Sequence, residues 1–153
     1  MSYKVIVNAT LAKFSASHFL KEPFQCSRLH GHNYYISVEV EASLDENYIV
    51  VDFIELKEKI KIIAQSLDHR VLIPELSSDL AISETSESIE VVTNTNKRYV
   101  FPKIDVILLP LPATTSELLA KFVHDKIKEI YPNKRITIKL EETKNTIAVY
   151  KSN

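Results

Sequence analysis

Apolar and polar residues alternate along two early stretches of the chain, and this period of two predicts β-strands. In the first stretch, Lys4 to Phe14, both faces are partly apolar. The second stretch, Asn33 to Leu44, is clearer because its apolar residues share one face, namely Ile36, Val38, Val40 and Ala42. We therefore expect two consecutive strands near the N-terminus, the second with one face in the core.

Apolar residues spaced three and four positions apart predict two helices. The first runs from about Asp52, a good N-cap, to Ser66, and its apolar face comprises Phe53, Leu56, Ile60, Ile63 and Leu67. The second runs from about Ser116 to Ile130, with Thr115 as its cap and Pro132 just beyond its end. Its apolar face comprises Leu119, Phe122, Val123, Ile127 and Ile130.

Two further strands follow the second helix, at about 136–140 and 147–150. The segment between the helices, about 75–112, reads as an insertion in which Ile89 to Thr93 pairs with Arg98 to Phe101 as a hairpin. No repeat or flexible linker divides the chain, so residues 1–153 are expected to form a single domain. The simplest arrangement is an α+β fold with helices on one face of an antiparallel sheet.

The composition indicates an ordinary globular protein and excludes several classes of partner. The chain is 45% hydrophobic and 25% charged, with a formal net charge of −1. Such a near-neutral balance offers no field for nucleic acid or an anionic membrane. The longest apolar run, Val106 to Leu111, is too short to cross a bilayer, and the N-terminus lacks the blocks of a signal peptide. The lone cysteine fits a reducing cytoplasm.

The stretch CSRLHGHNYY, residues 26–35, contains the only cysteine, the only glycine and two of the five histidines. On a strand His30 and His32 project from the same face, whereas Gly31 faces the other way. An isolated His-x-His pair is usually a solvated strand face. His18 can supply a third imidazole, and three imidazoles with one open position suit a catalytic zinc ion. Both interpretations remain open from the residues alone.

Cys26 lies in a polar loop, and this environment favours a reactive thiol over a buried structural one. The pair Asp68-His69 ends the first helix and reads either as a C-terminal cap or as a proton relay in which Asp68 orients the imidazole. His124, within the second helix, has no such neighbours and is expected at the surface. No glycine-rich loop exists for phosphate.

Taken in order, the stretches FSASH, CSRLHGHNY, VVDFIELK, LDHRVL, TTSELLAKF and EETKNTIAVYK resemble the 6-pyruvoyl-tetrahydropterin synthase / 6-carboxy-tetrahydropterin synthase family over nearly the whole chain. The resemblance implies a T-fold (tunnelling fold): a four-stranded antiparallel sheet with two helices on one face, here with an inserted hairpin. It implies zinc ligands His18, His30 and His32, and catalytic residues Cys26, Asp68 and His69. It also implies that the pterin is bound by Glu142, Thr115 and Glu117. A carboxylate such as Glu142 can accept two parallel hydrogen bonds from the amino-pyrimidine edge of a pterin.

Two branches of the family use 7,8-dihydroneopterin triphosphate. The Cys-x-x-x-His spacing and the string Thr-Ser-Glu-x-Leu-Ala-Lys resemble the carboxy branch, which makes 6-carboxytetrahydropterin with loss of acetaldehyde and triphosphate, toward the deazapurine bases of tRNA. The ending Thr-x-x-Asn-x-Ile-x-Val-Tyr-Lys leans toward the pyruvoyl branch, which eliminates triphosphate on the route to tetrahydrobiopterin. We give the spacing more weight because it surrounds the cysteine. A non-catalytic zinc- or pterin-binding protein is the third alternative.

The resemblance also implies partners and a location. The expected partner is a small-molecule pterin, without nucleic acid or membrane, and the expected assembly is a cytoplasmic homo-oligomer based on trimers, such as a hexamer. Arg28 and Lys21 are candidates for triphosphate contacts because they lie close to the cysteine in sequence. The insertion departs from compact family members, so its role is left open.

Overall fold

The computed structural model describes residues 1–152, which divide into two compact units. The first unit contains Met1–Phe14, Asn33–Asp68 and the residues from Ser116 onward, and the second contains Ser15–His32 and His69–Thr115. The expectation of a single domain stays a prediction. Within the described residues, no helix is both long and apolar enough to span a membrane.

The first unit contains four strands that pair antiparallel: β1 (Tyr3–Val7), β3 (His30–Ala42), β9 (Arg135–Thr143) and β10 (Thr146–Lys151). β3 pairs with β1 through Val40 opposite Val5, and with β9 through Val38 opposite Ile138. The alternation expected along β3 is confirmed, because Ile36, Val38 and Val40 are fully buried. The first three residues of β3 belong to the second unit.

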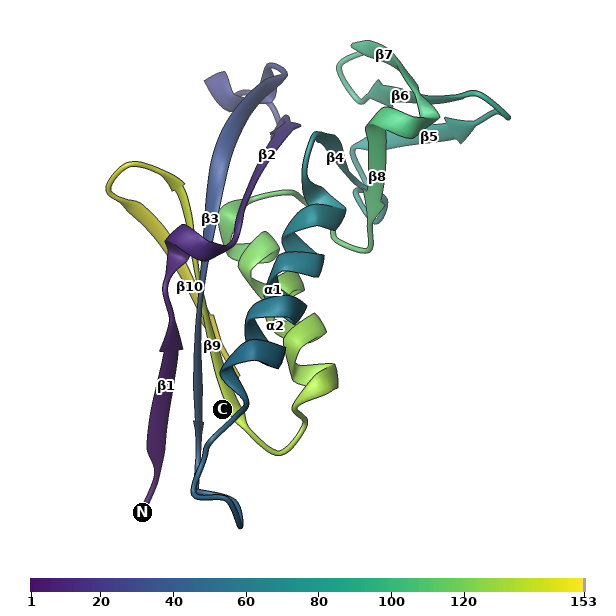
Figure 1. Ribbon diagram of the computed structural model, residues 1–153. Coiled ribbons are helices and arrows are strands. Elements are labelled where there is room, and N and C mark those ends of the chain that lie inside the picture. Colours follow the sequence, from purple (N-terminus) through teal and green to yellow (C-terminus); the bar gives the residue numbers. More distant parts are fainter. Residues whose placement is uncertain (153) are drawn as a thin grey trace. The chain divides into compact units, whose positions relative to one another are not determined.

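Two helices cover the buried face of these strands. α1 (Phe53–Leu67) begins after Asp52, whose carboxylate accepts hydrogen bonds from the N–H groups of Ile54 and Glu55, so the expected N-cap is confirmed. α2 (Ser116–Ile130) has the bounds that its apolar spacing predicts, and it packs against β9, β10 and α1. Figure 1 shows both helices on the same side of β3, β9 and β10.

The expected first strand, Lys4 to Phe14, is wrong as one element. The chain forms β1, then a 3-10 turn, η1 (Ala9–Leu11), and then β2 (Lys13–His18). Both strands read as extended sequence, and because both faces of the stretch are partly apolar, alternation alone could not locate the turn. The separate strand β2 continues past the expected end at Phe14, and His18 is its last residue.

The surface position expected for His124 is also wrong, since only 2% of this residue is exposed. Its Nε2 lies 3.2 Å from Ser152 Oγ, its Nδ1 lies 3.0 Å from Asp125 Oδ1, and its ring meets Tyr150 edge-on. The end of β10 therefore covers this face of α2. Because histidine is polar, the sequence pattern did not indicate that this helix position is buried. The signal that could have indicated it is Ile127, an apolar residue three positions later on the same face of α2.

The second unit contains three strands in parallel pairing and a separate antiparallel sheet. β4 (Arg70–Pro74) pairs with the end of β2 on one side and with β8 (Val106–Leu109) on the other, after a short 3-10 turn, η3 (Lys103–Asp105). The inserted sheet consists of β5 (Leu80–Glu84), β6 (Ser88–Thr93) and β7 (Arg98–Pro102). A further 3-10 turn, η2 (Gln25–Ser27), precedes β3.

The expected hairpin of the insertion is confirmed, with Ile89 opposite Phe101 in β6 and β7. The sequence reading missed β5, which adds a third strand to it. One face of this inserted sheet packs into a core cluster of Phe19, Ile73, Ile89, Val91 and Val106. The insertion is thus a folded part of the second unit, anchored on β4 and β8.

Candidate metal centre and active site

Three imidazoles from β2 and β3 converge in the second unit. His18 ends β2, and His30 and His32 begin β3 one residue apart, so they project from the same face. One nitrogen from each ring lies within 4.8 Å of the others, and the ring centroids are 4.7 to 5.4 Å apart. The structure therefore brings together the three residues that the sequence predicts as metal ligands.

Backbone carbonyls orient two of the three rings. His18 Nδ1 lies 2.9 Å from the carbonyl oxygen of Thr114, and His30 Nδ1 lies 2.6 Å from that of Arg28. A carbonyl only accepts hydrogen bonds, so each Nδ1 is the donor, and in a neutral imidazole of this tautomer Nε2 has the lone pair. This is the usual arrangement of histidines that ligate a metal through Nε2. The donor set and its tautomers fit a zinc ion.

Gly31, between the two ligands of β3, is required by a close approach of the backbone. A Cβ at this position would lie 3.1 Å from the carbonyl oxygen of Ala16 and 3.3 Å from Ser17 Oγ, both in β2. The φ angle of Gly31 is not in the left-handed region, so space and not backbone freedom explains this glycine. The sequence alone allowed a close approach or a bulge, and the structure identifies the former.

Cys26 lies in a loop between β2 and β3, which we call the cysteine loop (residues 19–29). Its thiol is exposed, and its carbonyl oxygen accepts a hydrogen bond of 2.8 Å from the N–H of Leu20. The N–H groups of Ser27 and Arg28 bond to carbonyls of Phe24 and Gln25 in the turn η2. These bonds close the loop on itself and leave the thiol accessible to a small molecule.

His69 follows α1 in an unusual backbone conformation. Its φ angle is 57°, in the left-handed region that residues other than glycine rarely adopt. Its N–H donates to the carbonyl oxygen of Ser15 at 2.7 Å, so β2 holds the backbone of this exposed residue. Asp68 is the C-cap of α1, half-buried, and it belongs to the first unit. The cap expected from the sequence is confirmed, and the relay stays a prediction.

Glu142 lies in the first unit beside a buried tyrosine that the sequence reading missed. The hydroxyl group of Tyr34 donates to Glu142 Oε1 at 3.3 Å, and the Tyr34 ring stacks on Phe14 with centroids 4.7 Å apart. Burial, followed by the nearby Glu142 carboxylate, raises the pKa of Tyr34 well above its usual range. Tyr34 therefore stays a hydrogen-bond donor that can orient the carboxylate. Its position two residues after His32, on the same face of β3, is the signal that could have revealed it.

The remaining expected site residues lie where α2 begins. Thr115 is half-buried at the end of the second unit, and Glu117 is exposed in the first turn of α2. The residue before Thr115 is fully buried and supplies the carbonyl that His18 contacts, so this segment positions a ligand as well as preceding a helix. The roles of Thr115 and Glu117 toward a pterin stay predictions.

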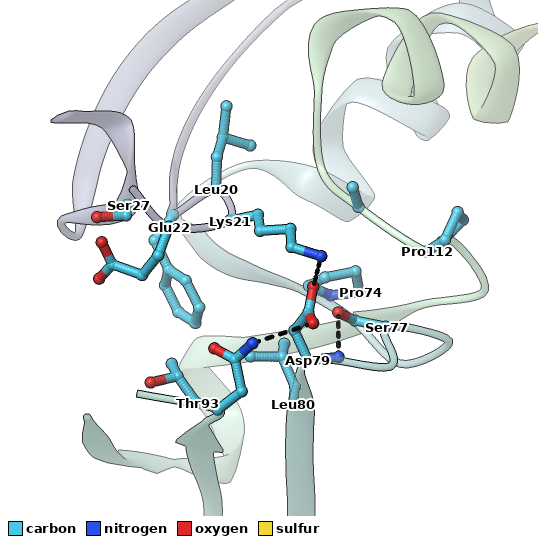
Figure 2. A pocket seen from close by; sticks show the side chains of 13 residues that line it. Leu20, Lys21, Glu22, Ser27, Pro74, Ser77, Asp79, Leu80, Thr93 and Pro112 are labelled. Atoms are coloured by element: carbon cyan, nitrogen blue, oxygen red, sulfur yellow. Dashed lines mark hydrogen bonds and ion pairs between the residues drawn. The ribbon is translucent and has the colours of Figure 1, made fainter. Parts of the chain in front are cut away.

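A cavity of about 90 Å³ lies within the second unit beside the cysteine loop (Figure 2). Its lining includes Phe19 and Ser27, the chain neighbours of His18 and Cys26. Lys21, one of the two expected triphosphate contacts, lines it and forms an ion pair with Asp79 at 2.9 Å. Arg28 is exposed. The cavity contains none of the expected ligands or catalytic residues among its lining.

The fold and the imidazole cluster define the class of this protein: an α+β protein with a three-histidine metal-type site. Comparison with known proteins then identifies the family. The family model of 6-pyruvoyl tetrahydropterin synthase matches residues 8–153. The chain belongs to the 6-pyruvoyl tetrahydropterin synthase family.

Curated relatives and solved structures agree with this assignment. A Pyrococcus horikoshii protein with the provisional name 6-carboxy-5,6,7,8-tetrahydropterin synthase is 31% identical over 119 residues, which cover 76% of this chain and 70% of the relative. A Methanocaldococcus jannaschii protein with the same provisional name is 32% identical over 122 residues, which cover 79% and 74%.

The structure of 6-pyruvoyltetrahydropterin synthase from Plasmodium vivax superposes with a TM-score of 0.91 at 25% identity, covering 100% of this chain and 99% of that one. This likeness confirms the expected α+β T-fold. The match covers almost the whole of both chains. It therefore includes the insertion, about residues 75–112, which departs from compact family members.

Proposed function

We propose that this protein is a zinc-dependent 6-carboxy-5,6,7,8-tetrahydropterin synthase, which converts 7,8-dihydroneopterin triphosphate to 6-carboxytetrahydropterin with release of acetaldehyde and triphosphate. The observation that carries the proposal is the convergence of His18, His30 and His32 within a chain of this family. The names of the Pyrococcus and Methanocaldococcus relatives support the carboxy branch. The four-residue step from Cys26 to His30 supports it as well.

In this proposal His18, His30 and His32 would hold the zinc ion. A zinc ion bound there would supply a Lewis acid for the side-chain oxygens of the substrate. The carbonyls of Thr114 and Arg28 fix the tautomers of His18 and His30, so that in the neutral imidazole Nε2 is the atom available to a metal. Glu142, oriented by Tyr34, binds the amino-pyrimidine edge of the pterin and fixes the position of the ring, together with Thr115 and Glu117.

Proton transfer is assigned to Cys26 and His69. Cys26, as a thiolate on an exposed loop, removes a proton from the substrate side chain. His69 supplies or relays a proton, and Asp68 sets its tautomer. The bond from the His69 N–H to Ser15 restricts the backbone that carries this imidazole. The thiol and the imidazole are thus both carried by segments of the second unit.

A glutamate is the competing candidate for the base. One solved structure of the Plasmodium vivax protein is described as a variant in which a catalytic glutamate is replaced by alanine. In this chain Glu22 is the only carboxylate of the cysteine loop. Its hydrogen bond from Lys97, followed by that from Ser27, lowers the pKa of Glu22. An engaged carboxylate of lowered pKa is a poorer proton acceptor, so Cys26 is the better candidate.

The pyruvoyl branch is the second candidate function, because the Plasmodium structures that match the whole chain are 6-pyruvoyltetrahydropterin synthases. A non-catalytic zinc- or pterin-binding protein is a third, and it would need neither Cys26 nor His69. We further propose a homo-oligomer based on trimers, such as a hexamer, that acts in the cytoplasm. Its product would enter the biosynthesis of deazapurine tRNA bases.

The deciding experiment is incubation of the pure, zinc-loaded protein with 7,8-dihydroneopterin triphosphate, followed by product analysis. Acetaldehyde together with a carboxylated pterin is the expected result. A diketo pterin without acetaldehyde would assign the protein to the pyruvoyl branch instead. Bound zinc without any turnover would leave the non-catalytic alternative.

A further inference from the structure

Lys97 connects the inserted sheet to the cysteine loop at two points. It lies just before β7, and its Nζ forms an ion pair with Glu22 and lies 3.4 Å from Ser27 Oγ. Glu22 precedes Cys26 and Ser27 follows it, so the two partners stand on opposite sides of the thiol in the chain. A single ammonium group therefore bridges both limbs of the loop that carries the proposed base.

Two further contacts join the same segments. Phe19 stacks on Tyr99 of β7 with ring centroids 4.9 Å apart and an interplanar angle of 16°. Lys21 Nζ lies 2.9 Å from Asp79 Oδ2, and Asn94 Nδ2 donates to the other carboxylate oxygen of Asp79 at 3.1 Å. The insertion is thus attached at the start of the loop and at both sides of Cys26.

The cavity beside the loop explains why these polar contacts matter. Figure 2 shows loop residues such as Leu20 and Ser27 and insertion residues such as Asp79 and Thr93 around the same space. Close packing normally fixes the position of a segment, and a void removes that constraint. Lys21 and Asp79 both line this space, and their ion pair holds the loop there. Lys97 contacts two further lining residues, Glu22 and Ser27, from outside the cavity.

We propose that Lys97 is a positioning residue of the active site: it fixes the cysteine loop so that the Cys26 thiol lies where the substrate side chain is deprotonated. The catalytic part of this inference rests on the proposed function, and the structural part does not. It gives the insertion a role, because a compact family member without this sheet must hold its loop by other contacts. Exposed ion pairs are usually weak, but a bridge between two limbs acts on the geometry of the loop.

The test replaces Lys97 with methionine, which keeps the length of the side chain and removes its charge. The matched control is Arg98→Met, because Arg98 is the next residue and forms a bidentate ion pair with Glu90 within the inserted sheet. Amide hydrogen exchange over residues 20–28 reports on the loop without any substrate. Steady-state kinetics and zinc content are measured on the same holoproteins.

In Lys97→Met we expect exchange over residues 20–28 to accelerate about tenfold, and kcat to fall about tenfold while zinc content and KM change little. Arg98→Met should leave the exchange rates of the loop and kcat unchanged. Exchanging the charges, in the double variant Glu22→Lys with Lys97→Glu, should recover part of both losses.

Unchanged exchange in Lys97→Met, or an equal acceleration in Arg98→Met, would overturn the positioning role. Accelerated exchange with an unchanged kcat would overturn its catalytic part. If the wild-type protein does not turn over dihydroneopterin triphosphate while Lys97→Met alone loosens the loop, the proposed function fails and the structural bridge is supported.

Discussion

Substituting Gly31 with alanine tests whether the close approach of β2 and β3 sets the geometry of the metal site. The new Cβ would lie 3.1 Å from the carbonyl oxygen of Ala16, whereas ordinary contacts begin at 3.4 Å. The two strands must therefore separate by about 0.3 Å, and both ligands of β3 flank the substituted position. Because the obstructing atom belongs to the backbone, a side-chain rotation cannot relieve the contact.

We expect two measurable consequences. Overpacking of this size costs about 1–2 kcal/mol of unfolding free energy, measured by denaturant unfolding of the metal-free protein. The displaced imidazoles should weaken zinc binding about tenfold, measured by competition with a chelator of known affinity, since changes outside the ligand set typically have effects of this order. Gly31→Val should be worse in both assays, because its side chain is larger.

The double variant Ser17→Ala with Gly31→Ala separates the two contacts. It removes the hydroxyl group 3.3 Å from the new Cβ and keeps the carbonyl at 3.1 Å, so we expect no more than a partial recovery. Full recovery would mean that the Ser17 side chain, and not the backbone approach, requires glycine. Wild-type stability and zinc affinity in Gly31→Ala itself would refute the reasoning.

Three further substitutions test the site and the sheet. His30→Ala should abolish stoichiometric zinc, measured by metal analysis after dialysis, and a variant that keeps one zinc per chain would remove His30 from the ligand set. Cys26→Ala should bind the substrate, measured by calorimetry, yet fail to turn over; near-normal turnover would exclude the thiol as base. Hydrogen bonds from Lys139 and Lys4 lower the pKa of Glu39. The ionised carboxylate therefore stabilises the fold fully above the pKa of the unfolded state, and this stabilisation is lost as the pH falls through the pKa of the folded state. Glu39→Gln should therefore destabilise the protein by about 1 kcal/mol at neutral pH and by progressively less as the pH falls through the folded pKa, and an effect that does not shrink with falling pH would contradict this.

The sequence predicted most of the helices and strands of the first unit, because there a single face of each element is buried. α2 has the predicted bounds, since its apolar spacing is regular and Pro132 stops it. β5 and β4 were missed for a different reason. Leu80 and Ile82 of β5 are only half-buried, and β4 is a short parallel strand whose partners, β2 and β8, are distant in sequence. Local alternation carries no information about such pairing.

The candidate site was predictable to the extent that its chemistry lies in side chains close together in the sequence. His18, Cys26, His30 and His32 fall within fifteen residues, so one strand-loop-strand segment delivers them. Lys97 could not be predicted, because its partners lie 70 and 75 residues earlier and an isolated lysine carries no signal of its own. Long-range contacts of single charged residues require the fold.

The groups that orient the imidazoles could not be predicted for a further reason: they belong to the backbone. The carbonyl that holds His18 comes from a residue 96 positions later, and any side chain there could provide it. At His18 and at His30 a backbone carbonyl accepts the hydrogen bond, so the sequence of side chains does not reveal these partners. The neutral partners also have a consequence for the chemistry. If zinc binds there as proposed, a carbonyl adds no negative charge to it, which would favour binding of the oxygens of the proposed triphosphate substrate.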